Sequence, residues 1–241
     1  LHPILHAFPT RRSSDLTMLL QVNTNWKTIK SMKYGFLTGI LYLAPYKLSG
    51  KNVCPAASLG CRLSCLNTAG RGQMGVVQKA RLRKTKMFFR DRNKFLSQLK
   101  TEIEILSRRA ANKNMKLAIR LNGTSDLPFE RYLIDGKNLM DHFPKVKFYD
   151  YTKLENRIND QLPGNYHLTF SRSETNEAVI DQVIEKAPVS VVFKNKLPRL
   201  YNGYKVINGD LHDMRFKNQS GVIIGLIAKG KARKDTTGFA I

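Results

Sequence analysis

Cys54-Pro-Ala-Ala-Ser-Leu-Gly-Cys61-Arg-Leu-Ser-Cys65 contains all three cysteines of this 241-residue chain. The segment follows an apolar run, residues 36–43, that predicts a buried β-strand. Three thiolates on one short loop can converge on a single metal centre, and soft thiolate ligands select iron–sulfur clusters or zinc. The sequence therefore predicts a metal site at the end of a strand.

The number of ligands separates the two kinds of metal site. A structural zinc ion needs four protein ligands, yet the chain has no fourth cysteine and no histidine between Ala7 and Asp141. A cubane cluster bound by three cysteines leaves one iron open, which suits a site that binds a small molecule. Two alternatives stay open: a zinc site completed by a ligand from elsewhere in the chain, and three thiols without a metal.

The composition indicates a basic globular protein. Hydrophobic residues make up 42% of the chain and aromatic residues 9%, and the length allows one domain with a good core. The net charge of +23 and the pI near 10.1 predict an anionic partner, most simply nucleic acid; a solubilising surface without a ligand is the alternative. No apolar run approaches the ~20 residues of a membrane span, so no membrane partner is expected. An odd, clustered set of cysteines favours the cytoplasm over a disulfide framework.

The amino terminus differs from the rest of the chain. Residues 5–16 resemble a translated sequencing-adapter read and show neither helical nor strand periodicity. We therefore expect residues 1–18 to be an artefactual or disordered tail. Residues 19–241 are expected to form a single α/β domain, with the three-cysteine loop at 54–65.

After Lys113 the sequence repeats a simple unit of apolar strand, polar tip, and helix or loop. Strands that alternate with helical stretches are typical of a mostly parallel sheet or barrel, and such folds place their chemistry at the carboxyl ends of the strands. We therefore expect an α/β fold, an incomplete (βα) barrel-like structure with a mostly parallel sheet. The strands are expected at residues 19–22, 36–43, 117–121, 146–149, 167–170, 189–193, 205–207 and 221–228.

Two segments are expected to be helical. Within residues 74–110 apolar residues recur at three- and four-residue spacing, and Asp91 is a candidate cap; residues 177–186 form the second segment. The first segment is rich in Lys and Arg, so it predicts a helix that lies along phosphates, unless this is only a solvated outer face. The candidate nucleic-acid-binding residues, on this helix and near the carboxyl terminus, are Arg81, Arg83, Lys84, Lys86, Lys229, Lys231, Arg233 and Lys234.

A strand, a three-cysteine loop, a helix and further βα units resemble the radical S-adenosylmethionine (radical SAM) superfamily. The usual spacing there is Cys-x3-Cys-x2-Cys, whereas this chain has Cys-x6-Cys-x3-Cys. Over about residues 23–241 the chain more closely resembles the gene product 88-like group, an uncharacterised family of bacteriophage proteins. This resemblance implies a phage origin and the host cytoplasm, and no established reaction. The motifs that carry it are Gly39-Ile-Leu-Tyr-Leu-Ala-Pro45, Ser49-Gly50, Asn52-Val-Cys54-Pro55, Thr68-Ala-Gly-Arg-Gly72, Asn122-Gly-Thr-Ser-Asp126 and Lys229-Gly-Lys-Ala-Arg-Lys-Asp235.

The radical SAM resemblance implies roles for particular residues. Cys54, Cys61 and Cys65 would bind a [4Fe–4S] cluster, and S-adenosylmethionine (SAM) would chelate its open iron. In such proteins the tip after the second strand meets the amino group of SAM, and the tip after the fourth strand meets its carboxylate and ribose. The corresponding residues here are Asn122, Ser125 and Asp126, followed by Ser171, Arg172, Ser173 and Glu174.

Each tip also has a structural interpretation. Asn122 and Asp126 are residues that form turns and cap helices. Arg172 and Glu174 are two apart on an expected strand, so they would share a face and form a surface ion pair. The lone histidines have no ligand spacing and are interpreted as structural; they are His142, His167 and His212.

Two functions are compatible with these patterns. One is an iron–sulfur, SAM-binding radical enzyme that acts on a nucleic acid or nucleotide. The other is a basic nucleic-acid-binding phage protein whose zinc or thiol loop is only structural. No residue is assigned a catalytic role in either.

Overall fold

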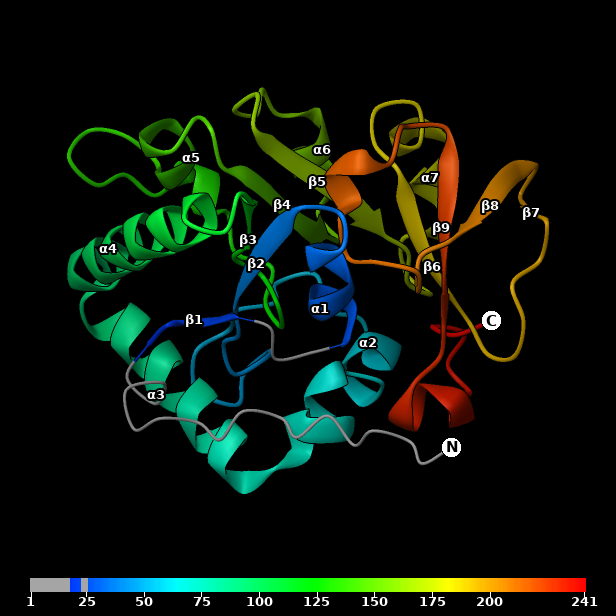
Figure 1. Ribbon diagram of the computed structural model, residues 1–241. Coiled ribbons are helices and arrows are strands. Elements are labelled where there is room, and N and C mark those ends of the chain that lie inside the picture. Colours follow the sequence, from blue (N-terminus) through cyan, green and yellow to red (C-terminus); the bar gives the residue numbers. More distant parts are fainter. Residues whose placement is uncertain (1–17, 23–25) are drawn as a thin grey trace, which may run out of the picture.

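A computed structural model describes residues 18–22 and 26–241, so all but the last residue of the expected tail lies outside the described residues. Within them, nine strands form one sheet in the order β1-β2-β3-β4-β5-β6-β9-β8-β7 (Figure 1). The strands are β1 (Leu20–Val22), β2 (Phe36–Leu41), β3 (Lys116–Arg120), β4 (Lys147–Thr152), β5 (Tyr166–Ser171), β6 (Val189–Phe193), β7 (Leu200–Tyr201), β8 (Tyr204–Asn208) and β9 (Val222–Ile227).

The strand directions place the carboxyl ends of the parallel strands on one side of the sheet. Strands β2 to β6, β9 and β8 are parallel to their neighbours, whereas β1 and β7 are antiparallel and lie at the two sides of the sheet. The α/β class with a mostly parallel sheet is confirmed, but a barrel is not, because β1 and β7 each pair with only one strand of the described sheet. The parallel strands all end on the same side, which we call the carboxyl edge.

Helices follow the strands, and one expectation about them is corrected. The basic segment expected over residues 74–110 is two helices, because Asp91 ends α3 with an extended backbone and starts α4. Its Oδ1 accepts from Lys94 N at 2.9 Å, which confirms the predicted cap. The helices are α1 (Trp26–Met32), α2 (Leu59–Leu63), α3 (Gly75–Arg90), α4 (Arg92–Ala111), α5 (Leu139–His142), α6 (Glu155–Asn159) and α7 (Ile180–Val183).

Single turns of 3₁₀ helix connect many of these elements. One of them continues directly into α7, so the helix expected over residues 177–186 is shorter than predicted. The 3₁₀ turns are η2 (Leu66–Thr68), η3 (Gly70–Gln73), η4 (Phe129–Arg131), η5 (Glu177–Val179), η6 (Arg215–Lys217) and η7 (Gly230–Lys234).

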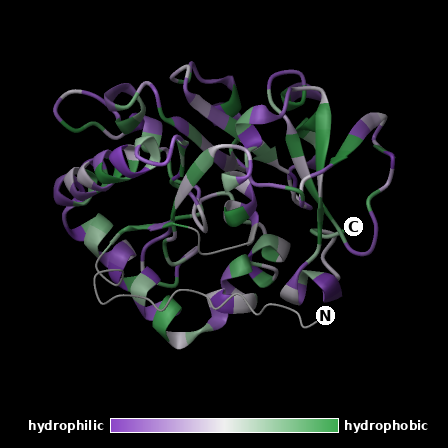
Figure 2. Cartoon of the chain, viewed as in Figure 1, coloured by the Kyte–Doolittle hydropathy of each residue, from purple (hydrophilic) through white to green (hydrophobic). Residues whose placement is uncertain are grey.

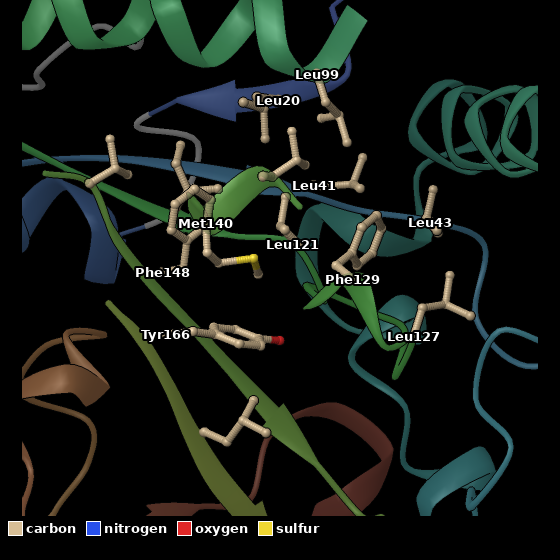
Figure 3. Packing of buried hydrophobic residues seen from close by; sticks show 14 of the residues in the cluster. Leu20, Leu41, Leu43, Leu99, Leu121, Leu127, Phe129, Met140, Phe148 and Tyr166 are labelled. Carbon is tan, nitrogen blue, oxygen red and sulfur yellow. The ribbon is translucent and has the colours of Figure 1, made fainter. Parts of the chain in front are cut away.

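The main core lies between the sheet and the long helices. The fully buried residues there include Leu41 of β2, Leu121 directly after β3, Phe148 of β4 and Leu99 of α4 (Figure 3). Figure 2 shows hydrophilic and hydrophobic residues alternating along α3 and α4, as expected for helices with one buried face. Burial of this apolar surface is the main source of stability for the sheet.

The opposite face of the sheet carries a smaller apolar cluster and several polar side chains. Phe36, Ala118 and Tyr149 pack there against Met214 and Phe216, which lie in and beside η6. Helix α1 packs on β2 on this side, away from α4 (Figure 1). We call this surface the inner face.

Candidate metal centre

The three cysteines are gathered at the carboxyl edge, in the segment that follows β2. Cys54 follows a turn at residues 45–53, and Cys65 lies between α2 and η2. Cys61 lies in α2, whose start is capped by Ser58, because Ser58 Oγ accepts from Cys61 N at 3.2 Å. All three thiols are free and half-buried.

Backbone N–H groups are directed at two of the three sulfur atoms. Tyr46 N donates to Cys54 Sγ at 3.4 Å, and the backbone of Asn67 donates to Cys65. Burial raises the pKa of Cys54 to about 12 and also raises the pKa of Cys65, and the N–H donors oppose both shifts. The Cys54 and Cys65 thiols therefore hold their protons more tightly than exposed cysteines do, and a metal would have to displace these protons, as a bound cation does with a coordinating thiol.

The three sulfurs are close enough to influence one another. After burial and the N–H bond, the charges of Cys65 and Cys61 each raise the pKa of Cys54. However, no three His, Cys, Asp or Glu side chains among residues 18–22 and 26–241 are spaced to hold a single metal ion. The cysteines are thus grouped, but they do not form a ligand set for one ion in this arrangement.

Cationic side chains lie beside this group. Burial has the largest effect on the pKa of Cys65 and raises it, whereas Arg81 and Lys153 lower it through their charges. Arg81 is buried, and its guanidinium lies 5.0 Å from the centre of the Tyr42 ring. These positive charges favour thiolates at the site.

Lys153 connects the tips of two neighbouring strands. It follows β4, and its Nζ donates to Ser171 Oγ, at the end of β5, at 2.6 Å. Its ammonium also lies 5.4 Å from the centre of the Phe239 ring, near the carboxyl terminus. The sequence predicted a strand at residues 146–149 but did not single out this lysine after it.

Glu174, after β5, holds the cysteine loop in place. Its carboxylate accepts from Ser58 Oγ at 2.8 Å and from Gly60 N at 2.6 Å, both in the turn that carries Cys61. A Cβ at Gly60 would stand only 2.1 Å from Thr237 Oγ1. The loop is therefore clamped between the β5 tip and the carboxyl-terminal segment, and only glycine fits there without a shift.

The β3 tip is a hydrogen-bonded turn, as its structural interpretation predicted. Asn122 Oδ1 accepts from Ser125 Oγ and from Leu127 N, each at 2.8 Å. Asp126 Oδ1 accepts from Arg157 Nη1 at 2.7 Å in a buried ion pair. These polar groups already have protein partners, so their role toward SAM stays a prediction.

The same tip supports the cysteine loop directly. Asp126 N donates to Val53 O at 2.8 Å, next to Cys54 in the chain. The Cys54 thiol donates to Thr124 O at 3.6 Å, and Thr124 Oγ1 donates to Leu43 O at 2.6 Å. The loop thus rests on the tips of both β3 and β5.

Arg172 and Glu174 do not form the ion pair that was considered for them. Both lie beyond the end of β5, where strand alternation no longer places them on one face. Arg172 donates instead to the carbonyl oxygens of Gly238 and Phe239 and pairs with Glu177. Arg172 therefore anchors the carboxyl-terminal segment, while Glu174 anchors the cysteine loop.

Comparison with known proteins gives one match. The family model described as gene product 88 matches residues 18–241, nearly the whole chain. The chain belongs to the gene product 88 family. No curated protein and no solved structure matches it.

The basic residues of this gene product 88 protein divide into exposed and buried sets. Arg81 and Lys84 of α3 are 7% and 3% exposed, which removes them from the surface proposed to meet phosphates. Lys84 Nζ donates to Leu19 O, and Arg81 donates to the side chain of Asn67. The other six candidates are exposed: Arg83, Lys86, Lys229, Lys231, Arg233 and Lys234.

The inner face of the gene product 88 protein holds polar groups that the sequence analysis missed. Arg120 Nη1 lies 3.3 Å from Asp213 Oδ2, which also accepts from Tyr149 OH at 3.0 Å. The hydroxyls of Thr38 and Thr169 are buried and have no hydrogen-bond partner within the part of the chain that the structure describes. Alternation along β2, β3 and β5 indicates the face, but the sheet order is needed to bring these residues together.

The histidines of this protein have the packing expected of structural residues. His142 Nε2 lies 2.8 Å from Ile134 O. The rings of His167 and His212 pack against Phe216 and Tyr34, with centroid distances of 6.2 and 5.6 Å.

Among the helices of the described ranges, none has the length and apolar character needed to cross a bilayer.

Proposed function

We propose that this gene product 88 protein is a SAM-binding iron–sulfur enzyme that acts on a nucleic acid or nucleotide in the cytoplasm of the phage host. Cys54, Cys61 and Cys65 are its cluster ligands. One observation carries the proposal: the three free cysteines lie together at the carboxyl edge of a parallel sheet, with N–H donors at two of the sulfurs. Hydrogen bonds to the sulfurs are one means by which proteins tune such clusters.

A cluster and a zinc ion require different arrangements of the cysteine sulfurs. Around zinc, all ligand atoms contact the same ion and must approach closely. In a cubane cluster each cysteine binds a different iron atom, so the sulfurs stand farther apart. Among the described residues no three such side chains are spaced for a single ion, which counts against a zinc site.

Cys54, Cys61 and Cys65 would hold a [4Fe–4S] cluster, which would supply one-electron reductive cleavage of a carbon–sulfur bond of SAM, with an external one-electron donor as the reductant and methionine as the leaving group. The protein has to bind and orient SAM for this. By the radical SAM resemblance, Asn122, Ser125 and Asp126 serve the amino group, and residues 171–174 serve the carboxylate and ribose. Lys153 adds a cation between these tips and Cys65 that suits the carboxylate.

Polar groups on the inner face are suited to bind a polar small molecule. Buried hydroxyls nearly always have a hydrogen-bond partner, so the orphaned Thr38 and Thr169 are exceptions that a bound ligand or water would explain. Arg120 stacks over Tyr151 on the same face, 4.6 Å from the ring centre. A nucleotide or the nucleoside part of SAM has hydroxyls and a planar base that match such groups.

The test is anaerobic purification followed by measurement of iron, acid-labile sulfide and zinc, then of 5′-deoxyadenosine after addition of SAM and dithionite. The proposal expects iron and sulfide in equal amounts and 5′-deoxyadenosine that depends on both additions. Matched samples of Cys61→Ala should form none. Zinc as the sole metal, or a cluster that does not cleave SAM, would contradict the proposed enzymatic activity.

A second candidate is a basic nucleic-acid-binding protein in which the cysteine loop is only structural. The hydrogen bonds that Glu174 accepts from the loop, and those between the loop and the β3 tip, favour it, because they already hold the loop without a metal. In this case the as-isolated protein would carry zinc or no metal, and loss of the metal would weaken folding and nucleic-acid binding together.

A further inference from the structure

Helix α3 and the turn at residues 45–53 form an open groove of about 900 Å³. Five basic residues line it: Lys51 of the turn, and Lys79, Arg83, Lys86 and Arg90 of α3. All five are exposed, and no acidic residue lines the groove. The groove therefore has a strongly positive rim.

The four α3 residues form one continuous row. Their spacings of four, three and four residues place them on the same side of the helix. At 1.5 Å per residue, the row spans about 16 Å. Like charges at these spacings repel one another, and a bound polyanion would remove that repulsion.

The floor of the groove is apolar rather than charged. The apolar lining consists of Leu82, Met87 and Phe89, which are half-buried. On the helix, Leu82 and Phe89 lie on one side of the basic row and Met87 lies on the other. A duplex presents phosphates outward and hides its bases, so it would leave this floor unused. A single strand can place its backbone on the basic rim and its bases on apolar and aromatic side chains.

The groove also adjoins the candidate metal centre. Its wall, the turn at residues 45–53, closes through a hydrogen bond from Val53 N to Tyr46 O at 3.2 Å. The same turn supplies the N–H of Tyr46 that donates to Cys54 Sγ. A ligand in the groove would therefore lie beside the turn that directly precedes Cys54.

We infer that this groove binds single-stranded nucleic acid, with phosphates on the row from Lys79 to Arg90 and bases on Leu82, Met87 and Phe89. The inference rests on the nucleic-acid part of the proposed function and specifies its form. It assigns binding to α3 rather than to the basic residues of η7, and to single strands rather than duplex.

The test uses fluorescence anisotropy on the full chain with a labelled oligodeoxythymidine, an abasic oligonucleotide of the same length, and a duplex. The double variant Lys86→Glu, Arg90→Glu should bind the single strand more weakly. Its slope of log affinity against log salt should fall by about 0.7 for each phosphate that the variant no longer neutralises. The matched control, Arg108→Glu with Arg109→Glu, makes the same charge change at exposed positions of α4 and should bind almost as the unaltered protein does.

Met87→Gln tests the floor without a change of charge. It should weaken binding of oligodeoxythymidine and leave binding of the abasic strand unchanged. Equal affinity for duplex and single strand, or no effect of Met87→Gln, would overturn the base contacts. If Lys86→Glu with Arg90→Glu binds the single strand as tightly as the α4 control does, the groove is not the binding site. Loss of binding in Lys231→Glu with Arg233→Glu would instead place the site at η7.

These outcomes are distinguishable from failure of the proposed enzyme. Cluster content and 5′-deoxyadenosine formation are measured on the same groove variants, which leave all three cysteines intact. If the groove variants bind single strands as the unaltered protein does while the cluster still forms, only this inference is contradicted. No binding to any of the three probes at low salt would contradict both the inference and the nucleic-acid partner.

Discussion

Glu174 Oε1 accepts a hydrogen bond from Gly60 N at 2.6 Å, across 114 residues of sequence. This contact joins the tip of β5 to the turn that carries Cys61. A carboxylate that accepts from a backbone N–H and from a hydroxyl makes hydrogen bonds stronger than neutral ones. Glu174 is thus a positioning residue for the cysteine loop.

Glu174→Ala should loosen the loop without unfolding the domain. The variant removes two hydrogen bonds to a charged acceptor, which costs on the order of 2 kcal/mol of local stability. We expect faster reaction of Cys61 with a thiol reagent and lower iron content after reconstitution. Glu185→Gln, an exposed acid after α7, is the control and should change neither. Thiol reactivity equal to that of the control would show that the loop does not depend on Glu174.

Cys54, Cys61 and Cys65 should behave as one ligand set. Replacement of any one of them by Ala should remove most of the metal rather than a third of it, because a cluster with two remaining ligands is poorly held. The measurement is iron, sulfide and visible absorption after anaerobic reconstitution. Three variants that each keep full cluster content would rule out the ligand set.

Gly60→Ala should destabilise the protein by about 1–3 kcal/mol, the usual range for overpacking. The added Cβ would stand 2.1 Å from Thr237 Oγ1 and 2.5 Å from Phe239 Cβ. Gly75→Ala, at the start of α3, is the matched control, because its Cβ would meet nothing within 4 Å. Thermal unfolding should show a lower Tm for the first variant and an unchanged or higher Tm for the second. Equal Tm values would mean that the clamp on Gly60 is looser than described.

Asp150 should make stability depend on pH. Burial raises the pKa of this carboxyl to about 6, although Arg120, the N–H of Asn122 and Tyr166 oppose the shift. In the unfolded chain it titrates near ~3.9. As pH rises from about 4 through about 6, the unfolded chain gives up this proton first, so the contribution of Asp150 to folding stability is present below the window and lost across it.

Asp150→Asn removes this titration. We compare the free energy of unfolding of the unaltered protein with that of the variant at each pH. The unaltered protein should lose roughly 2–3 kcal/mol relative to the variant between pH 4 and pH 7, at about 1.4 kcal/mol per pKa unit. Chemical denaturation at several pH values measures the difference, and Asp181→Asn, at an exposed position, serves as the control. Parallel stability curves for the unaltered protein and Asp150→Asn would contradict the raised pKa.

Local patterns in the sequence predicted much of the architecture. The apolar runs, the turn-prone tips and the cap at Asp91 depend on residues within a few positions of one another, so periodicity and spacing reveal them. The same holds for the cysteine loop, whose three thiols lie within residues 54–65. The position of β9 between β6 and β8 was not predictable in this way, since sheet order depends on packing between distant segments.

The sequence by itself determined the α/β class, the mostly parallel sheet and the grouping of Cys54, Cys61 and Cys65 on one loop. The tertiary structure alone decided that Glu174 clamps this loop while Arg172 turns to the carboxyl-terminal segment. It also decided that Arg81 and Lys84 lie on the buried face of the basic helix α3, whereas Arg83 and Lys86 are exposed. The physical reason is range: periodicity encodes which face of an element is apolar, whereas the partner of a polar side chain depends on which elements the completed sheet brings together.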